Sequence, residues 1–63
     1  MSDFLERLMV EREELRAKMH KLRLFLCSDK FLEIDKIQQD LLSIQIDTMN
    51  AYLSVLTARI ELL

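Results

Sequence analysis

The sequence contains no glycine, no proline and no tryptophan, and it has one cysteine and one histidine among 63 residues. Turns with positive φ normally recruit glycine, and sheets need several such turns. A chain without glycine or proline is therefore expected to be all-α, with very few reversals. Cys27 has no partner for an intrachain disulfide, and Cys27 with His20 is too few ligands for a zinc site within one chain. We expect no metal and no cofactor.

The small size of the chain sets the next constraint. A domain of about 60 residues buries only about 60% of the surface that its unfolded chain exposes. Such chains usually add disulfides, a metal or self-association to a core worth only about 3–5 kcal/mol. An intrachain disulfide and a zinc site are excluded here. Residues 1–63 are therefore expected to form a single domain that is stable only as a homo-oligomer.

Charge gives no global attraction to nucleic acid or to an acidic membrane, because nine Lys+Arg stand against eleven Asp+Glu, a net charge of −2. The basic residues of the first half alternate with Glu11, Glu13 and Glu14 and lack interleaved aromatics, which is typical of a solvated, ion-paired surface. No secretion signal is visible, and the longest uncharged stretch, 48–58, is too short to span a bilayer. We expect a cytoplasmic protein that binds neither nucleic acid nor membrane.

Catalytic machinery is missing from the pattern. His20 and Cys27 lie seven residues apart on the same expected helix, which separates them by two turns and roughly 10 Å. They cannot form a nucleophile–base pair within one chain. There is no glycine-rich phosphate loop and no HExxH pair of metal ligands. The sequence predicts a protein that is not an enzyme.

Hydrophobic periodicity predicts two long helices. Over about 3–27, apolar side chains step by threes and fours, with one interruption at Arg12; they are Leu5, Leu8, Leu15, Met19, Leu22 and Leu26. The pattern breaks over about 28–35, and a second helix is expected over about 36–62, opened by a capping box of Asp35 and Gln38. Because a short connection makes two helices antiparallel neighbours, the predicted fold is a two-helix antiparallel hairpin.

The second helix is apolar on more sides than one partner helix can cover. One row holds Leu42, Met49, Leu56 and Leu63; a second holds Leu41, Ile44, Ala51, Val55, Ala58 and Leu62; a third holds Ile46, Leu53 and Ile60. A helix that is hydrophobic all round must be buried. We therefore expect hairpins to assemble into a homo-oligomeric bundle. The predicted oligomer core comprises Leu42, Ile46, Met49, Leu53, Leu56 and Ile60.

Polar residues also recur on the second helix, where Gln45, Tyr52 and Arg59 follow one another every seven residues. In the predicted hairpin, Tyr52 lies opposite Glu11 and Arg12, and Gln45 lies opposite Lys18. These residues have two interpretations: a polar cluster that fixes the register of the helices, or a pocket where protomers meet. The second interpretation supplies cations for phosphate and a ring for stacking. Its ligand-binding residues are Arg7, Glu11, Lys18, Gln45, Tyr52 and Arg59.

An ordered string of residues runs through most of the chain: Phe4-x-x-Arg7, then Glu11-x-x-Glu14-Leu15-x-x-Lys18-x-x-Lys21-Leu22-x-x-Phe25, then Phe31, then Leu42-x-x-Gln45-x-x-x-Met49-x-x-Tyr52-x-x-x-Leu56-x-x-Arg59-Ile60. It resembles a family of short helical proteins encoded by phages and prophages and related to a crAss-like phage protein. The resemblance implies a phage accessory protein acting in the cytoplasm of the host cell. In size and expected hairpin form, the chain is also similar to phage inhibitors of CBASS and Thoeris defence. Those inhibitors include small oligomeric helical hairpins that hold cyclic nucleotides or ADP-ribose-derived signals between protomers.

These resemblances lead to a functional hypothesis: a homo-oligomeric sponge that sequesters a small nucleotide-type immune signal, either a cyclic nucleotide or an ADP-ribose derivative. The competing hypothesis is a protein-binding module whose exposed apolar row docks on a host or phage protein. A structural component of the phage is a third. The first two differ in whether Ile46, Leu53 and Ile60 are buried, because exposure of that row favours a protein partner.

Overall fold

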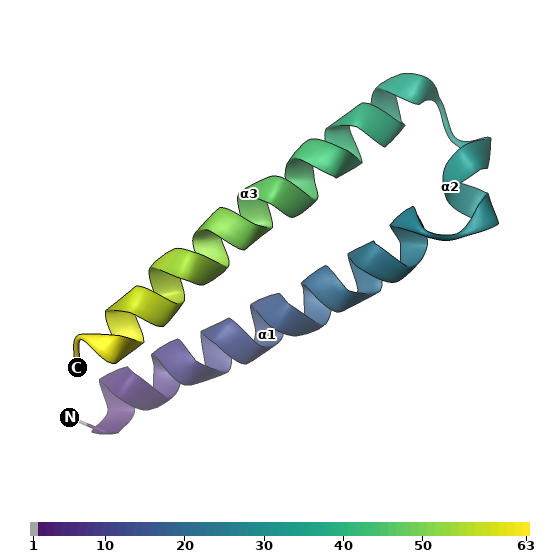
Figure 1. Ribbon diagram of the computed structural model, residues 1–63. Helices are drawn as coiled ribbons and strands as arrows, with labels where there is room; N and C mark the ends of the chain where they lie inside the picture. The colour runs from purple at the N-terminus through teal and green to yellow at the C-terminus, as the bar shows by residue number, and fades with distance from the viewer. Residues whose placement is uncertain (1) are drawn as a thin grey trace.

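The computed structural model describes residues 2–63, except for the side chain of Ser2, and contains three helices. They are α1 (Ser2–Leu26), α2 (Asp29–Glu33) and α3 (Lys36–Glu61). Figure 1 shows α1 and α3 side by side and running in opposite directions, with both termini at one end and α2 at the other. The molecule is a rod of 47 × 15 × 12 Å. The predicted all-helical class is confirmed. Over residues 2–63, no helix has the length and apolar character needed to cross a membrane.

The predicted turn contains a helix of its own, so the expectation of only two helices is wrong. The Ser28 hydroxyl donates to the carbonyl of Phe25 at 2.6 Å, and the amide of Phe31 donates to the carbonyl of Ser28 at 3.2 Å. The rings of Phe25 and Phe31 meet edge to face, with centroids 6.1 Å apart. Local hydrogen bonds from serine and an aromatic pair therefore turn the chain at negative φ, without glycine.

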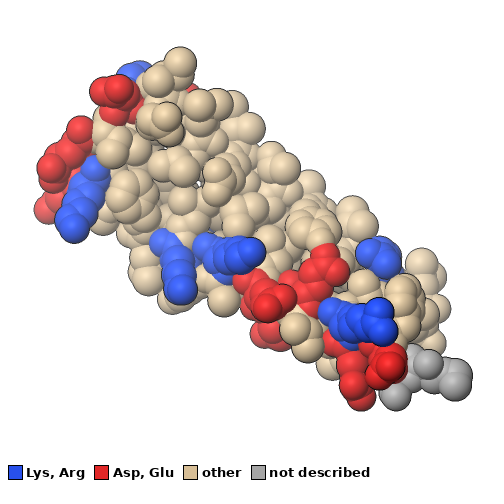
Figure 2. All heavy atoms as spheres, turned by 180° about the vertical axis from the view of Figure 1, so that it is seen from behind, with Lys and Arg blue, Asp and Glu red and all other residues tan. Residues whose placement is uncertain are grey.

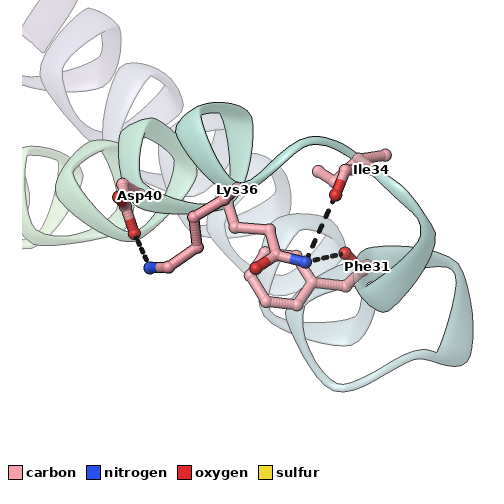
Figure 3. A network of polar contacts seen from close by, with 5 residues as sticks. Phe31, Ile34, Lys36 and Asp40 are labelled. Atoms are coloured by element: carbon pink, nitrogen blue, oxygen red, sulfur yellow. Dashed lines mark hydrogen bonds and ion pairs between the residues drawn. The ribbon is translucent and has the colours of Figure 1, made fainter.

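The start of α3 differs from the predicted capping box. Asp35 is the N-cap residue, but its side chain makes no capping hydrogen bond. Instead, the side-chain amide of Gln39 donates to the carbonyls of Phe31, at 2.9 Å, and Ile34, at 3.4 Å. Figure 3 shows these two bonds beside the ion pair of Lys36 with Asp40. Gln39 thus ties α3 to the connection by satisfying carbonyls that α2 leaves without helical partners.

The core between α1 and α3 is small. Its buried side chains are Leu8, Leu15, Met19 and Leu56. Side chains of α3 pack partly buried against this cluster; they are Ile46, Met49, Leu53 and Ile60. The first and third apolar rows of the second helix therefore face α1 within the same chain. A core of this size gives marginal stability to a lone chain.

The second apolar row of α3 remains uncovered. With Ile37 and Thr48 it forms one continuous line in steps of three and four, which we call the outer stripe: Ile37, Leu41, Ile44, Thr48, Ala51, Val55, Ala58 and Leu62. Every residue of the outer stripe is exposed. Figure 2 shows a broad uncharged surface along the molecule, with Lys, Arg, Asp and Glu gathered along one edge and near the ends. Charge thus belongs mainly to α1, and exposed apolar surface mainly to α3.

Arg12 occupies an otherwise apolar position of the α1 seam, and its Nε is buried without a hydrogen-bond partner. A buried donor without a partner costs about 1–3 kcal/mol. We expect Arg12→Met, which retains a long flexible side chain, to raise the free energy of unfolding by about 1 kcal/mol or more. Urea unfolding at a fixed protein concentration measures this change.

The matched control is Arg16→Met, which removes an exposed ion pair with Glu13 at 2.9 Å. Exposed ion pairs of this spacing contribute about 0.3–0.5 kcal/mol. The control should therefore leave stability almost unchanged. A loss of stability in Arg12→Met would show that the guanidinium is a net stabilising group at this seam.

Candidate functional site

Two contacts between α1 and α3 define the two flanks of the pair. On one flank, the guanidinium carbon of Arg59 lies 5.9 Å from the centroid of the Phe4 ring. On the other, Nη2 of Arg23 donates to Oδ1 of Asn50 at 3.1 Å. The first contact is a cation–π interaction that joins the end of α3 to the start of α1. It identifies the flank on which the predicted ligand-binding residues lie.

Residues seven apart on a helix share a face, so these contacts place the remaining side chains. Glu11 and Lys18 follow Phe4 along α1, and Tyr52 and Gln45 precede Arg59 along α3. Five of the six predicted ligand-binding residues therefore share one side, which we call the polar flank: Glu11, Lys18, Gln45, Tyr52 and Arg59. Glu11 is partly buried and the other four are exposed. On α3, the polar flank lies between the core row that faces α1 and the outer stripe.

Arg7 lies off the polar flank, and Glu11 is the one polar-flank residue with which it shares a depression. It lies on the outward face of α1, where it lines an open depression with Asp3, Glu6, Val10, Glu11 and Glu14. This depression has four carboxylates against one guanidinium. Its local charge therefore opposes an anionic ligand, and the better cations for phosphate lie on the polar flank.

The polar flank offers two cations and one aromatic ring. Lys18 and Arg59 are exposed, and no carboxylate lies within ion-pair distance of either among the described residues. Tyr52 is 43% exposed, so its ring and hydroxyl are accessible at an edge of α3. Ammonium and guanidinium groups bind phosphate oxygens, and a tyrosine ring stacks on a flat base. The arrangement suits binding, and its side chains are not arranged as a nucleophile with its base.

The predicted oligomer-core residues lie on the inner side of α3. Leu56 is buried and Leu42, Ile46, Met49, Leu53 and Ile60 are partly buried. At least five of them face or adjoin the core with α1.

Sequence reasoning missed Phe4, although Phe4, Glu11, Lys18 and Phe25 follow one another every seven residues. That spacing was the available signal for an aromatic residue on the polar flank.

Among residues 2–63, no three His, Cys, Asp or Glu side chains come close enough to hold a metal ion.

Neither the curated proteins nor the solved structures compared with the chain include one that matches it. A protein-family model does match, and it covers residues 2–62. This match spans all three helices and the polar flank, and the chain belongs to the Sequestin family.

Proposed function

We propose that this protein binds and sequesters a small anionic nucleotide-type signal, and that the ligand is held on the polar flank between copies of the chain. The proposal is supported by membership of the Sequestin family, whose name denotes a sequestering protein. The observation that carries it is the placement of Lys18, Tyr52 and Arg59 on one exposed flank. Cyclic nucleotides and ADP-ribose-derived signals both combine phosphate with a flat base. Tyr52 can stack on the base and Arg59, two turns along α3, can bind the phosphate, whereas Lys18 lies roughly 20 Å from Arg59 at the other end of the flank.

Sequestration needs binding alone, so it requires neither a nucleophile nor a base among the side chains of the polar flank. A sponge lowers the free concentration of a signal in proportion to its own abundance and affinity. In a phage, such a protein would act in the host cytoplasm against defence systems such as CBASS or Thoeris. The similarity in size and helical form to phage inhibitors of those systems supports this role by analogy.

Replacement of Arg59 by alanine tests the site. A hydrogen bond to a charged group is worth about 1.5–3 kcal/mol. We expect Arg59→Ala to weaken binding of the captured signal by about 10- to 100-fold. Native mass spectrometry with a panel of cyclic dinucleotides and cyclic ADP-ribose derivatives identifies the ligand, and isothermal titration calorimetry measures the change.

The matched control is Arg16→Ala, because Arg16 is an exposed arginine of α1 that is paired with Glu13 away from the polar flank. It should bind the ligand like the wild type. Both variants should keep the wild-type helix content and oligomer mass. Equal loss of binding in the two variants would contradict the site assignment, and a folded protein that binds nothing in the panel would contradict the proposed function.

The exposed outer stripe favours a second candidate function, a module that docks on a host or phage protein. Its largest apolar side chains include Ile37, at 67% exposure, and Leu62, at 87%. The Ile46, Leu53 and Ile60 row packs against the core with α1, so a protein partner would use the outer stripe instead. The two functions therefore differ in what covers the outer stripe, which is another copy of the chain in the first and a host or phage protein in the second.

A further inference from the structure

The outer stripe has the spacing of a helix-pairing seam. Its eight residues step alternately by four and three along α3, as the apolar positions of a coiled coil do. Ile44 is 59% exposed and Val55 is 54% exposed, and the stripe lies on the side of α3 away from the core with α1. A helix that packs here would bury a continuous apolar line over almost the whole length of α3.

The chain exposes more surface than a compact monomer of its mass. A compact monomer of 7.5 kDa is expected to expose about 4,250 Å², whereas this chain exposes 4997 Å². The difference, about 750 Å², is close to the ~800 Å² that each partner contributes to a standard protein interface. The small buried core also favours self-association, because it leaves a lone chain marginally stable.

We propose that a second copy of this chain packs its α3 antiparallel along the outer stripe, about a twofold axis between Thr48 and Ala51. The residue sizes support this orientation. The larger residues lie in the first half of the stripe and most of the smaller ones in the second. An antiparallel partner places Leu41 against Ala58 of the other copy, and Ile44 against Val55. The small Thr48 and Ala51 then allow the closest approach at the axis.

The rows beside the outer stripe decide what each orientation brings together. On one side lies the polar row of Gln45, Tyr52 and Arg59; on the other lies an acidic row of Asp40, Asp47, Ser54 and Glu61. A parallel partner would set its acidic row against the polar row. An antiparallel partner sets polar row against polar row and keeps the carboxylates on the opposite side. The cost is an exposed approach of Asp40 to Glu61, which the ion pair of Lys36 with Asp40 reduces.

The antiparallel pair also joins the two polar flanks on one side of the assembly. Around α3, at about 100° per residue, the outer stripe and the core with α1 are roughly 160° apart through the polar row, so this is the more concave side by a small margin. Tyr52 of both copies would then lie near the twofold axis with Gln45 and Lys18, whereas the two Arg59 side chains would lie roughly 28 Å apart, toward the two ends of this shared side. This consequence rests on the proposed function, whereas the packing of the two copies does not.

Disulfide cross-linking tests the packing without any ligand. Cys27 is an exposed free thiol, so the experiment uses Cys27→Ser as its background. Leu41→Cys and Ala58→Cys are made separately in this background, mixed after reduction and denaturation, refolded and oxidised. We expect a covalent dimer only in the mixture, because position 41 of one copy meets position 58 of the other. Each variant alone should stay uncross-linked, since its two thiols lie roughly 25 Å apart along the helix axis.

Val10→Cys mixed with Leu24→Cys provides the matched control, because both residues are exposed on the outer side of α1. This mixture should give no covalent dimer. Cross-linking of each stripe variant by itself would show a parallel pair, and no stripe cross-link would show that no second copy covers the stripe; both results overturn the proposal. A cross-linked dimer that binds no nucleotide in the panel would leave the packing standing and refute only the proposed function.

Discussion

Replacing Leu56 by alanine is expected to unfold most of the protein at micromolar concentration. Leu56 is fully buried and is the α3 side chain at the centre of the core, where Leu8, Leu15 and Met19 complete the cluster. A buried Leu→Ala change costs about 2–5 kcal/mol, which is comparable to the whole stability of about 3–5 kcal/mol that so small a core supplies. Far-ultraviolet circular dichroism through a urea titration measures the loss.

The control is Leu32→Ala in α2, where the leucine side chain is 73% exposed. The same chemical change there removes little buried area, and stability should shift by less than about 0.5 kcal/mol. Both variants must be compared at one protein concentration, because self-association adds to apparent stability. A Leu56→Ala protein as stable as the wild type would show that the core of the assembled protein lies elsewhere.

The substitution Val55→Gln is expected to separate the two copies. Glutamine forms helix well, so the change tests the surface of α3 rather than the helix itself. In a twofold pair the amide is buried twice, and each burial without a partner costs about 1–3 kcal/mol. The dissociation constant of the dimer should therefore rise by about 30-fold or more. Sedimentation velocity across a concentration series measures this change.

Val10→Gln is the same substitution on the outward face of α1, at 57% exposure against 54% for Val55. It should leave the sedimentation coefficient unchanged. An effect of equal size at both valines would contradict a specific role for the outer stripe. If Val55→Gln unfolds as it dissociates, its helix content will become dependent on protein concentration, which still identifies the stripe as an interface.

The sequence by itself determined the helical class. Glycine and proline are absent, and apolar residues step by threes and fours, so no other class offered the chain a consistent local structure. The rows of Gln45, Tyr52 and Arg59 and of Glu11 and Lys18 are also periodic features of the sequence. The register of the predicted hairpin already set these rows opposite each other, and the contact of Arg59 with Phe4 in the structure places them on one flank.

Only the tertiary structure decided which two of the three apolar rows of α3 meet α1. All three rows are apolar; the first and third pack against Leu8, Leu15 and Met19, and the second stays exposed. It also revealed α2, because a helix of five residues is held by contacts of Ser28, Phe31 and Gln39 rather than by a periodic pattern. Hydrophobic pattern thus determines how much surface must be covered, whereas packing geometry determines which surface the chain covers itself and which it leaves for another copy.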